Sequence, residues 1–233
     1  MRSTLILLRH GESEYNKAHL FTGWTDVELS DKGREEAKEA GALLLAHEFY
    51  PDVCFTSWLK RAIHTAQLAL NEMAWEHIDC LKSWKLNERH YGAWQGRNKD
   101  EVKEEVGEAH FLAVRRGYDT PPPPLPKGDP RSAIFERKYF YVSPSQLPQS
   151  ESLKDTQKRA WTYYQQVISP ELSRGKTVLV SAHGNSLRAL VMGLEKLTPE
   201  EIVHVEIPTG VPWVYTLDET GEVIEKTALT QKH

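Results

Sequence analysis

Two histidines, each followed by a glycine, come directly after apolar segments of the chain. Arg9-His10-Gly11 follows residues 4–8, and Ala182-His183-Gly184 follows residues 177–181. A neutral imidazole can attack phosphorus, and an adjacent glycine lets backbone N–H groups approach an anion closely. One such pair is weak evidence, because most histidines are surface or core residues. The repetition makes His10 a candidate nucleophile and His183 its partner in a phosphate site.

Several arginines at the expected ends of secondary-structure elements support this hypothesis, namely Arg9, Arg61, Arg115 and Arg116. The guanidinium group holds phosphate oxygens in a bidentate manner and stabilises charge on a transferring phosphoryl group. Any one of these arginines alone is more commonly a solvated surface residue. Together with two histidines, they predict phosphoryl transfer carried out by side chains.

The transferred proton also needs an acceptor and donor. Glu88 lies in residues 86–92, a segment rich in polar and aromatic side chains, and is the candidate general acid and base. The alternative is a salt bridge from Glu88 to Arg89 or Arg116. The sequence contains neither the GxxxxGK[ST] nor the GxGxxG motif, which argues against nucleotide chemistry.

A metal site is the competing interpretation, because His10, His183, His90 and Glu88 are all metal-ligand types. The sequence lacks an HExxH motif, clustered aspartates and paired cysteines, so we expect no catalytic metal. Its two cysteines, Cys54 and Cys80, argue against a disulfide scaffold and favour a reducing cytoplasm.

Composition is typical of a soluble globular protein. The chain has 233 residues, of which 39% are hydrophobic and 27% are charged. The formal net charge of -4 provides no field that would attract nucleic acid or an anionic membrane. Residues 1–8 are too short for a signal peptide or a membrane span, and they predict a strand. We expect one domain, residues 1–233.

Strand and helix patterns alternate along the chain. Residues 4–8, 52–56 and 177–181 are apolar without alternation, as in parallel strands that are buried on both faces. Helical spacing follows each of the last two strands, and Ser30 and Ser57 are predicted to cap helices. This rhythm predicts a three-layer α/β fold with a mostly parallel central sheet and helices on both faces. If the histidine-bearing strands are neighbours, both imidazoles face one crevice.

Three further segments carry local signals. Residues 198–201 match a capping box with proline at the first helical position, and residues 211–217 resemble a late edge strand. Residues 115–148 are rich in proline, which excludes long regular elements. This irregular stretch is a surface excursion, a disordered linker or a lid over the site.

The motifs around both histidines resemble those of the histidine phosphatase superfamily, and more closely those of cofactor-dependent phosphoglycerate mutases. The similarity spans nearly the whole chain, and it rests on residues 8–16, 21–24, 29–30, 56–66, 86–92, 115–116, 121–123, 151–155, 182–186 and 208–212. The resemblance implies a mutase-like fold, a lid at residues 115–148, a homodimer or homotetramer, and no metal.

The resemblance also implies a reaction. His10 would become a phosphohistidine primed by 2,3-bisphosphoglycerate, and the enzyme would interconvert 3-phosphoglycerate and 2-phosphoglycerate, with bisphosphoglycerate synthase and phosphatase side activities. Glu88 would be the general acid and base, and His183 would stabilise the transferring group, with Arg9 and Arg61. The implied substrate-binding residues are Ser13, Asn16, Thr22, Gly23, Tyr91, Lys99, Arg115, Arg116, Gly184 and Asn185.

Other functions remain as alternatives. Bisphosphoglycerate mutases share this catalytic set but typically carry glycine at the position of Ser13 and Cys-Ser at Thr22-Gly23, so these residues favour the glycolytic mutase. A small-molecule phosphatase is favoured only by the short tail that ends at residues 231–233, where many relatives have a longer lysine-bearing one. A non-catalytic binding module is disfavoured because it needs no nucleophile.

Overall fold

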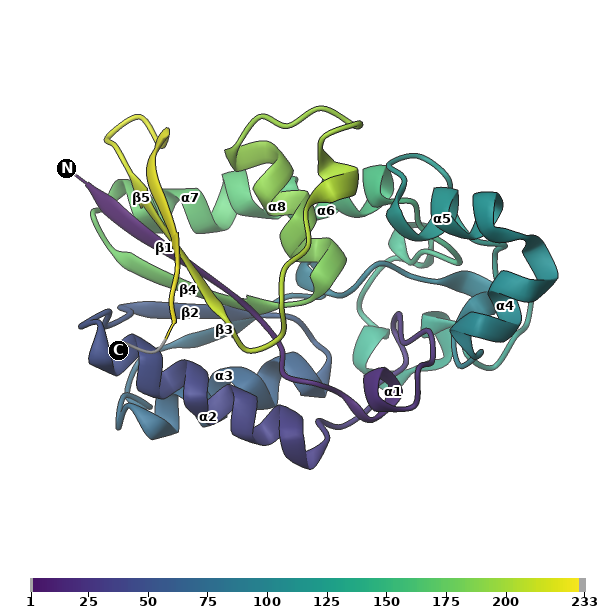
Figure 1. The fold of residues 1–233 in the computed structure, drawn as a ribbon, viewed down its shortest axis with the longest axis horizontal. Coiled ribbons are helices and arrows are strands. Elements are labelled where there is room, and N and C mark those ends of the chain that lie inside the picture. Colours follow the sequence, from purple (N-terminus) through teal and green to yellow (C-terminus); the bar gives the residue numbers. More distant parts are fainter. Residues whose placement is uncertain (1, 231–233) are drawn as a thin grey trace.

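The strand that carries the first histidine lies in the middle of a six-stranded sheet (Figure 1). In the computed structural model, which describes residues 2–230, β1 (Ser3–Arg9) pairs in parallel with β4 (Thr177–Ala182). The register runs from Thr4 opposite Thr177 to Arg9 opposite Ala182. The two histidine-bearing strands are therefore neighbours, as the sequence predicts, and both end at the same edge.

The strand order is β3-β2-β4-β1-β5-β6, and the first four strands are parallel. The remaining strands are β2 (Val53–Thr56), β3 (Cys80–Lys82), β5 (Pro212–Leu217) and β6 (Val223–Ala228). The predicted edge position of residues 211–217 is wrong, because β5 lies between β1 and β6 and pairs antiparallel with both. β6 was not predicted, since almost all of its side chains are exposed and it has no apolar pattern.

Helices cover both faces of this sheet, as expected of three layers. α2 (Asp31–Ala46) and α3 (Lys60–Glu72) lie on one face. The other face carries α6 (Leu153–Tyr163), α7 (Ser169–Ser173) and α8 (Gly184–Leu194), and a π-helical turn at residues 164–168 joins α6 to α7 (Figure 1). None of the helices in residues 2–230 is long and apolar enough to cross a membrane.

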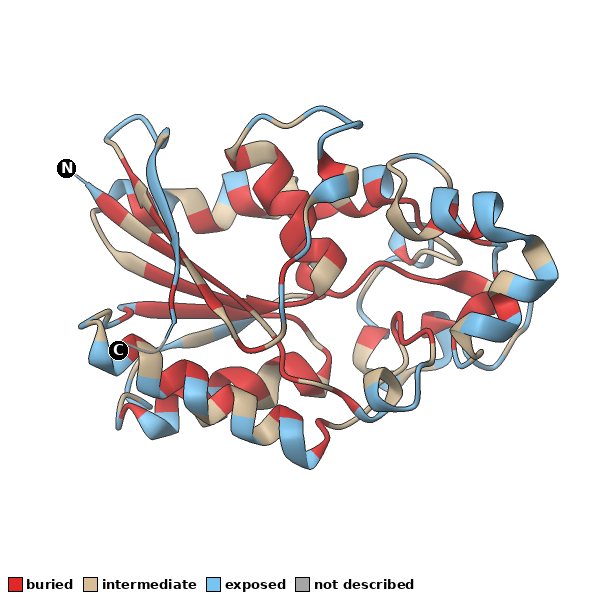
Figure 2. Cartoon of the chain, viewed as in Figure 1, coloured by how far each residue is buried: buried red, intermediate tan, exposed pale blue. Residues whose placement is uncertain are grey.

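The central strand β1 is buried on both faces, as its continuous apolar sequence predicts (Figure 2). Leu5 and Leu7 belong to the hydrophobic cluster under α6 and α8, whereas Ile6 and Leu8 belong to the cluster under α2 and α3. This alternation follows from the pleat of the strand, which directs successive side chains to opposite faces. It fixes the end of β1, and with it His10, relative to both helix layers.

The N-terminus of α2 packs against the loop after β1. Ser30 caps the helix as predicted, because its hydroxyl accepts a hydrogen bond from the N–H of Gly33 at 3.1 Å. A Cβ atom on Gly11 would lie only 2.1 Å from the carbonyl oxygen of Gly33, and one on Gly33 would lie 1.9 Å from that of Glu12. Both glycines are therefore required for this close approach.

The predicted cap of the next helix is wrong. α3 begins at Lys60, and the residue at its N-cap position is Leu59, which makes no side-chain capping bond. The hydroxyl of Ser57 instead accepts from the N–H of Leu59 at 3.1 Å and lies 2.7 Å from Nε2 of His183. Ser57 therefore belongs to the environment of the second histidine.

The capping-box motif at residues 198–201 forms its hydrogen bonds, but no α-helix follows it in the described residues. The reciprocal bonds form, since Thr198 N–H donates to Glu201 Oε2 at 2.8 Å and Glu201 N–H donates to Thr198 Oγ1 at 3.3 Å. Only a 3-10 turn, Ile202–His204, follows them. The predicted helix is therefore wrong, although its cap is present.

Short elements surround the carboxyl edge of the parallel strands. They are α1 (Glu14–Lys17), α4 (Lys99–Val106), α5 (Glu108–Arg116) and the 3-10 turns Trp84–Leu86 and Gly92–Trp94. α4 and α5 are held by a separate cluster of buried side chains, Phe21, Tyr91, Trp94, Val102, Phe111 and Val114. Figure 1 shows α1, α4 and α5 at the end of the molecule opposite the two termini.

The proline-rich residues 115–148 contain no long regular element, as expected. Beyond the end of α5 they form three 3-10 turns, Ala133–Phe135, Arg137–Tyr139 and Pro144–Gln146. The segment is packed against the rest of the fold: Tyr139 is 1% exposed and its hydroxyl accepts from the Asn87 side chain at 2.8 Å. Its role as a lid stays a prediction. Residues 231–233, the tail on which the phosphatase alternative rests, lie outside the described residues.

Candidate active site

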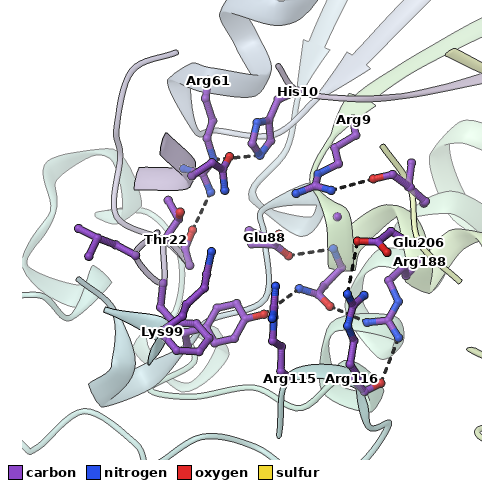
Figure 3. A pocket seen from close by; sticks show the side chains of 18 of the residues that line it. Arg9, His10, Thr22, Arg61, Glu88, Lys99, Arg115, Arg116, Arg188 and Glu206 are labelled. Atoms are coloured by element: carbon purple, nitrogen blue, oxygen red, sulfur yellow. Dashed lines mark hydrogen bonds and ion pairs between the residues drawn. The ribbon is translucent and has the colours of Figure 1, made fainter. Parts of the chain in front are cut away.

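The two imidazoles meet at the carboxyl edge of β1 and β4. The ring centroids of His10 and His183 lie 5.0 Å apart, and the ring planes are inclined by 62°. Both side chains are buried. Figure 3 shows His10 at one end of a pocket whose wall is rich in arginine. The duplicated His-Gly pattern therefore marks a single site.

The ring of His10 has a defined tautomer. Its Nδ1 lies 2.7 Å from the carbonyl oxygen of Gly11, and because a carbonyl only accepts, Nδ1 carries the hydrogen. The Nε of Arg61 donates to Nε2 at 3.3 Å, which requires a lone pair on Nε2. Burial, followed by the positive charges of Arg61 and Arg9, holds the pKa of His10 well below its ordinary value. His10 is therefore a neutral imidazole whose Nε2 can act as a nucleophile.

Hydrogen bonds to backbone carbonyl groups hold the Arg61 side chain next to His10. Its two terminal nitrogens donate to the carbonyl oxygens of Thr25 at 3.0 Å and Gly23 at 2.8 Å. The side chain is fully buried, and burial lowers the pKa of Arg61 to about 10. Arg61 is still a cation at neutral pH, so it is positioned to hold an oxygen of a group bonded to His10 Nε2.

His183 lies behind His10. Its Nε2 is 2.7 Å from the Ser57 hydroxyl, and its backbone N–H donates to the Ser186 hydroxyl at 3.1 Å. Burial and the nearby Arg61 hold the pKa of His183 well below its ordinary value. Its Nδ1 is buried and has no hydrogen-bond partner among residues 2–230. A neutral His183 ring thus lies next to the nucleophile, with its Nε2 bonded to Ser57.

Glu88 is held at the N-terminus of α8. Its Oε1 accepts from the backbone N–H of Asn185 at 3.1 Å and of Arg89 at 2.7 Å. A Cβ atom on Gly184 would lie 3.8 Å from Oε2 of Glu88 and 3.5 Å from Nε of Arg9, so the carboxylate and Arg9 flank the same glycine. Within the described residues, neither of the ion pairs expected under the alternative interpretation of Glu88 is present.

A buried ion pair supports the loop that carries Glu88. Arg159 of α6 donates to Glu151 through Nε at 2.6 Å and through Nη2 at 2.8 Å. The same guanidinium donates to the carbonyl oxygens of Lys85, Asn87 and Glu88, each at 2.8 Å. Arg159 was not predicted as a functional residue. No local signal distinguishes it, because the carbonyl groups that it holds lie more than 70 residues away in the sequence.

We expect the change Arg159→Met to lower the free energy of unfolding by about 3–5 kcal/mol, because it leaves the Glu151 carboxylate buried without its partner. Turnover should also fall, since the carbonyl of Glu88 loses one of its two donors within residues 2–230 and keeps only the indole N–H of Trp24. Urea denaturation followed by circular dichroism measures the first effect. The control is Arg174→Met, which breaks an exposed pair with Glu171 and should change stability by less than about 0.5 kcal/mol. Equal stability of the two variants would contradict this role of Arg159.

The pocket is strongly cationic. The cationic side chains that line it are Arg9, Arg61, Lys99, Arg115, Arg116 and Arg188, whereas its only carboxylates among the described residues are Glu88 and Glu206. Nη1 of Arg9 donates to the carbonyl oxygen of Ile207 at 2.7 Å, and its buried Nε has no partner among residues 2–230. A bisphosphorylated carboxylic acid fits this donor set, because each of its anionic groups can pair with a guanidinium.

Most of the predicted site residues line this one pocket, namely Arg9, His10, Asn16, Thr22, Gly23, Arg61, Glu88, Tyr91, Lys99, Arg115, Arg116, Gly184 and Asn185. His183 and Ser13 do not line it. The Ser13 hydroxyl caps α1 and donates to Asn16 Oδ1 at 2.9 Å, so Ser13 orients a lining residue. The lining residues that were not predicted are Leu20, Phe21, Arg188, Val205, Glu206 and Ile207.

The metal interpretation gains no support from the geometry of residues 2–230. No three His, Cys, Asp or Glu side chains within them are close enough to hold an ion. His90, one of the ligand types considered, is buried, and its Nδ1 accepts from the N–H of Gly92 at 3.0 Å. Burial lowers the pKa of His90 to about 4. His90 therefore has a structural role in the turn after Glu88.

Comparison with known proteins identifies the family. Residues 5–230 match the model of the histidine phosphatase superfamily, branch 1. A 2,3-bisphosphoglycerate-dependent phosphoglycerate mutase from Treponema denticola is 52% identical over 97% of this chain and 91% of its own length. One from Hydrogenobaculum is 50% identical over 98% of this chain and 93% of its own length. The chain belongs to the 2,3-bisphosphoglycerate-dependent phosphoglycerate mutase family of the histidine phosphatase superfamily.

More distant solved structures share the fold of this phosphoglycerate mutase family member. The alpha-ribazole phosphatase from Shigella flexneri superimposes with a TM-score of 0.70 at 21% identity, over 99% of this chain and 96% of its own. YhfR from Bacillus stearothermophilus gives a TM-score of 0.71 at 24% identity, over 95% and 94% of the two chains. The predicted three-layer α/β fold of the phosphoglycerate mutase type is thereby confirmed.

Proposed function

We propose that this protein interconverts 3-phosphoglycerate and 2-phosphoglycerate through a phosphohistidine at His10. The relatives that are about half identical over nearly the whole chain are named 2,3-bisphosphoglycerate-dependent phosphoglycerate mutases. The observation that carries the proposal is the neutral His10, whose Nε2 lone pair faces a guanidinium in a cationic pocket. When bound, 2,3-bisphosphoglycerate supplies the phosphoryl group that primes this nitrogen.

The residues around His10 have separate tasks in the transfer. Nε2 attacks phosphorus and the P–O bond to the donor's oxygen breaks, while Arg61 and Arg9 stabilise the oxygens of the transferring group. Glu88 takes the proton of the hydroxyl group that receives the phosphoryl group and returns it in the reverse step. His183, whose ring centroid lies 5.0 Å from that of His10, further stabilises the transferring phosphoryl group.

Lining residues next to the nucleophile favour a mutase acting on monophosphoglycerates over a bisphosphoglycerate mutase. Thr22 and Gly23 line the pocket, and Ser13 orients Asn16 in it. A Cβ atom on Gly23, whose φ is +52°, would lie 2.2 Å from the side-chain oxygen of Gln95. A larger residue at this position therefore requires a different position of the Gln95 side chain. The glycine thus shapes the pocket beside Arg61.

The test is turnover of 3-phosphoglycerate with and without micromolar 2,3-bisphosphoglycerate, read as 2-phosphoglycerate formed and inorganic phosphate released. We expect the bisphosphate to stimulate formation of 2-phosphoglycerate well above phosphate release. Phosphate release far faster than isomer formation supports the phosphatase alternative. Binding without either product supports a non-catalytic module.

Substrate affinity should depend on pH through Lys99. Burial and the charges of Arg115 and Arg9 lower the pKa of Lys99 to about 8. A bound anion favours the charged amine, so the affinity for 3-phosphoglycerate should fall about five- to tenfold between pH 7.5 and 9.5 as Lys99 loses its proton. Titration calorimetry across this range measures the change.

The variant Lys99→Met should bind more weakly at pH 7.5 and lose most of this pH dependence. Lys103→Met is the matched control, because Lys103 pairs with Glu108 on the surface and does not line the pocket. It should retain the profile of the parent protein. A flat profile in the parent would refute the assignment to Lys99.

The protein is further proposed to form a homodimer or homotetramer in the cytoplasm. Among residues 2–230, the edge strands β3 and β6 each pair with one strand only, and such open edges are commonly covered. Light scattering coupled to size exclusion measures the assembly. A monomer at working concentrations would contradict this proposal.

A further inference from the structure

Glu206 lies in the wall of the pocket without a role in the chemistry described above. Its neighbours Val205 and Ile207 also line the pocket, and Arg9 holds this segment through the carbonyl oxygen of Ile207 at 2.7 Å. The side chain of Glu206 is 69% exposed, and its Oε1 lies 3.3 Å from Nη2 of Arg116 (Figure 3). The backbone is therefore anchored, while the carboxylate stands in solvent at the rim.

The two carboxylates of the pocket differ in their partners. Glu88 accepts hydrogen bonds from the backbone N–H groups of Arg89 and Asn185. Within residues 2–230, the Glu206 side chain accepts only from the Arg116 side chain. Its charge also raises the pKa of Arg115, which opposes the lowering by burial. Glu206 thus faces both arginines at the end of α5, where a ligand anion would bind.

A ligand anion at Arg116 competes with this carboxylate. An exposed ion pair is weak, so a ligand displaces Glu206 from the guanidinium instead of being excluded by it. The displaced carboxylate stays within a few ångströms, because its backbone is fixed, and it repels the negative charge of the ligand. This repulsion grows with the charge of the ligand, so it acts most strongly on esters that carry two phosphate groups.

We propose that Glu206 is a specificity-determining residue that weakens the binding of multiply phosphorylated ligands relative to monophosphates. The identity of the ligands rests on the proposed function, whereas the charge effect rests on the pocket alone. In a mutase primed by a bisphosphate, such a residue keeps the bisphosphate from occupying the site permanently and leaves it open to monophosphoglycerate.

The test compares the double variant His10→Ala, Glu206→Gln with the single variant His10→Ala. The change at His10 prevents phosphoryl transfer during the measurement. Calorimetry gives Kd for inorganic phosphate, 3-phosphoglycerate and 2,3-bisphosphoglycerate at low and high salt. We expect Glu206→Gln to tighten 2,3-bisphosphoglycerate about three- to tenfold, 3-phosphoglycerate less and phosphate least, with the differences shrinking at high salt. The control Glu222→Gln, which breaks an exposed pair with Lys196 far from the pocket, should leave all three constants unchanged.

Unchanged, weaker or uniformly tighter binding of the three ligands by Glu206→Gln would overturn the inference. The outcome is separable from that of the proposed function, because binding is measured without turnover. Graded tightening in a protein whose wild-type form shows no mutase activity would refute the function and retain the role of Glu206. Normal mutase activity of the wild-type protein, together with Kd values that Glu206→Gln leaves unchanged, would support the function and refute the role of Glu206.

Discussion

The variant His10→Ala should form no phosphoenzyme and should lose about 10⁴-fold or more in turnover, because alanine removes the nitrogen that is positioned for attack. The expected loss is large since no other imidazole in the described residues lines the pocket with a free lone pair beside a guanidinium. Acid-labile, base-stable phosphate bound after incubation with 2,3-bisphosphoglycerate, mapped by mass spectrometry, gives the first readout. Turnover of 3-phosphoglycerate gives the second.

The matched control for this experiment is His204→Ala, in a 3-10 turn outside the pocket. It should retain both phosphoenzyme and turnover. Phosphate mapped to any residue other than His10 in the parent protein would refute the assignment of the nucleophile. Ligand binding should survive in His10→Ala, because the arginines of the pocket are untouched.

The variant Glu88→Gln should lower turnover about 10²- to 10⁴-fold, because an amide cannot accept the proton of the receiving hydroxyl group. Glutamine keeps the size of the side chain and an oxygen that can accept from the N–H groups of Asn185 and Arg89. Phosphorylation of His10 by 2,3-bisphosphoglycerate should be slowed, whereas affinity for 3-phosphoglycerate should change little or increase. Single-turnover kinetics separates the two effects.

Glu195→Gln is a suitable control for Glu88, since the Glu195 carboxylate bonds to Tyr215 and Lys226 outside the pocket. It should leave turnover within about twofold of the parent. If Glu88→Gln transferred phosphate at the parental rate, the proton would have to be handled by another group.

The parts of the fold that follow from local patterns could be predicted. Continuous apolar runs mark β1, β2 and β4, because strands buried on both faces need no polar residues. The cap at Ser30 follows from the chemistry of its own side chain. The pairing of β1 with β4 then places His10 and His183 together, so the nucleophile and its partner follow from sequence alone.

Features that depend on distant partners could not be predicted. Ser57 has the residue type of a helix cap, but its hydroxyl contacts His183, which is remote in the sequence. β6 has no apolar alternation, because β5 supplies its pairing and solvent covers its side chains. Arg159 and Glu206 resemble ordinary surface charges until the fold brings Glu151 and Arg116 to them.

The carbonyl group of Gly11 makes the site depend on the backbone as well as on side chains. This oxygen selects the tautomer of His10, and its direction depends on the tight contact between Gly11 and Gly33 in the first turn of α2. A methyl group at Gly33 would lie 1.9 Å from the Glu12 carbonyl oxygen and 2.7 Å from the Glu12 nitrogen, and that nitrogen belongs to the peptide whose carbonyl accepts from His10. Gly33 lies outside the pocket lining, yet its lack of a side chain leaves room for the backbone that positions His10.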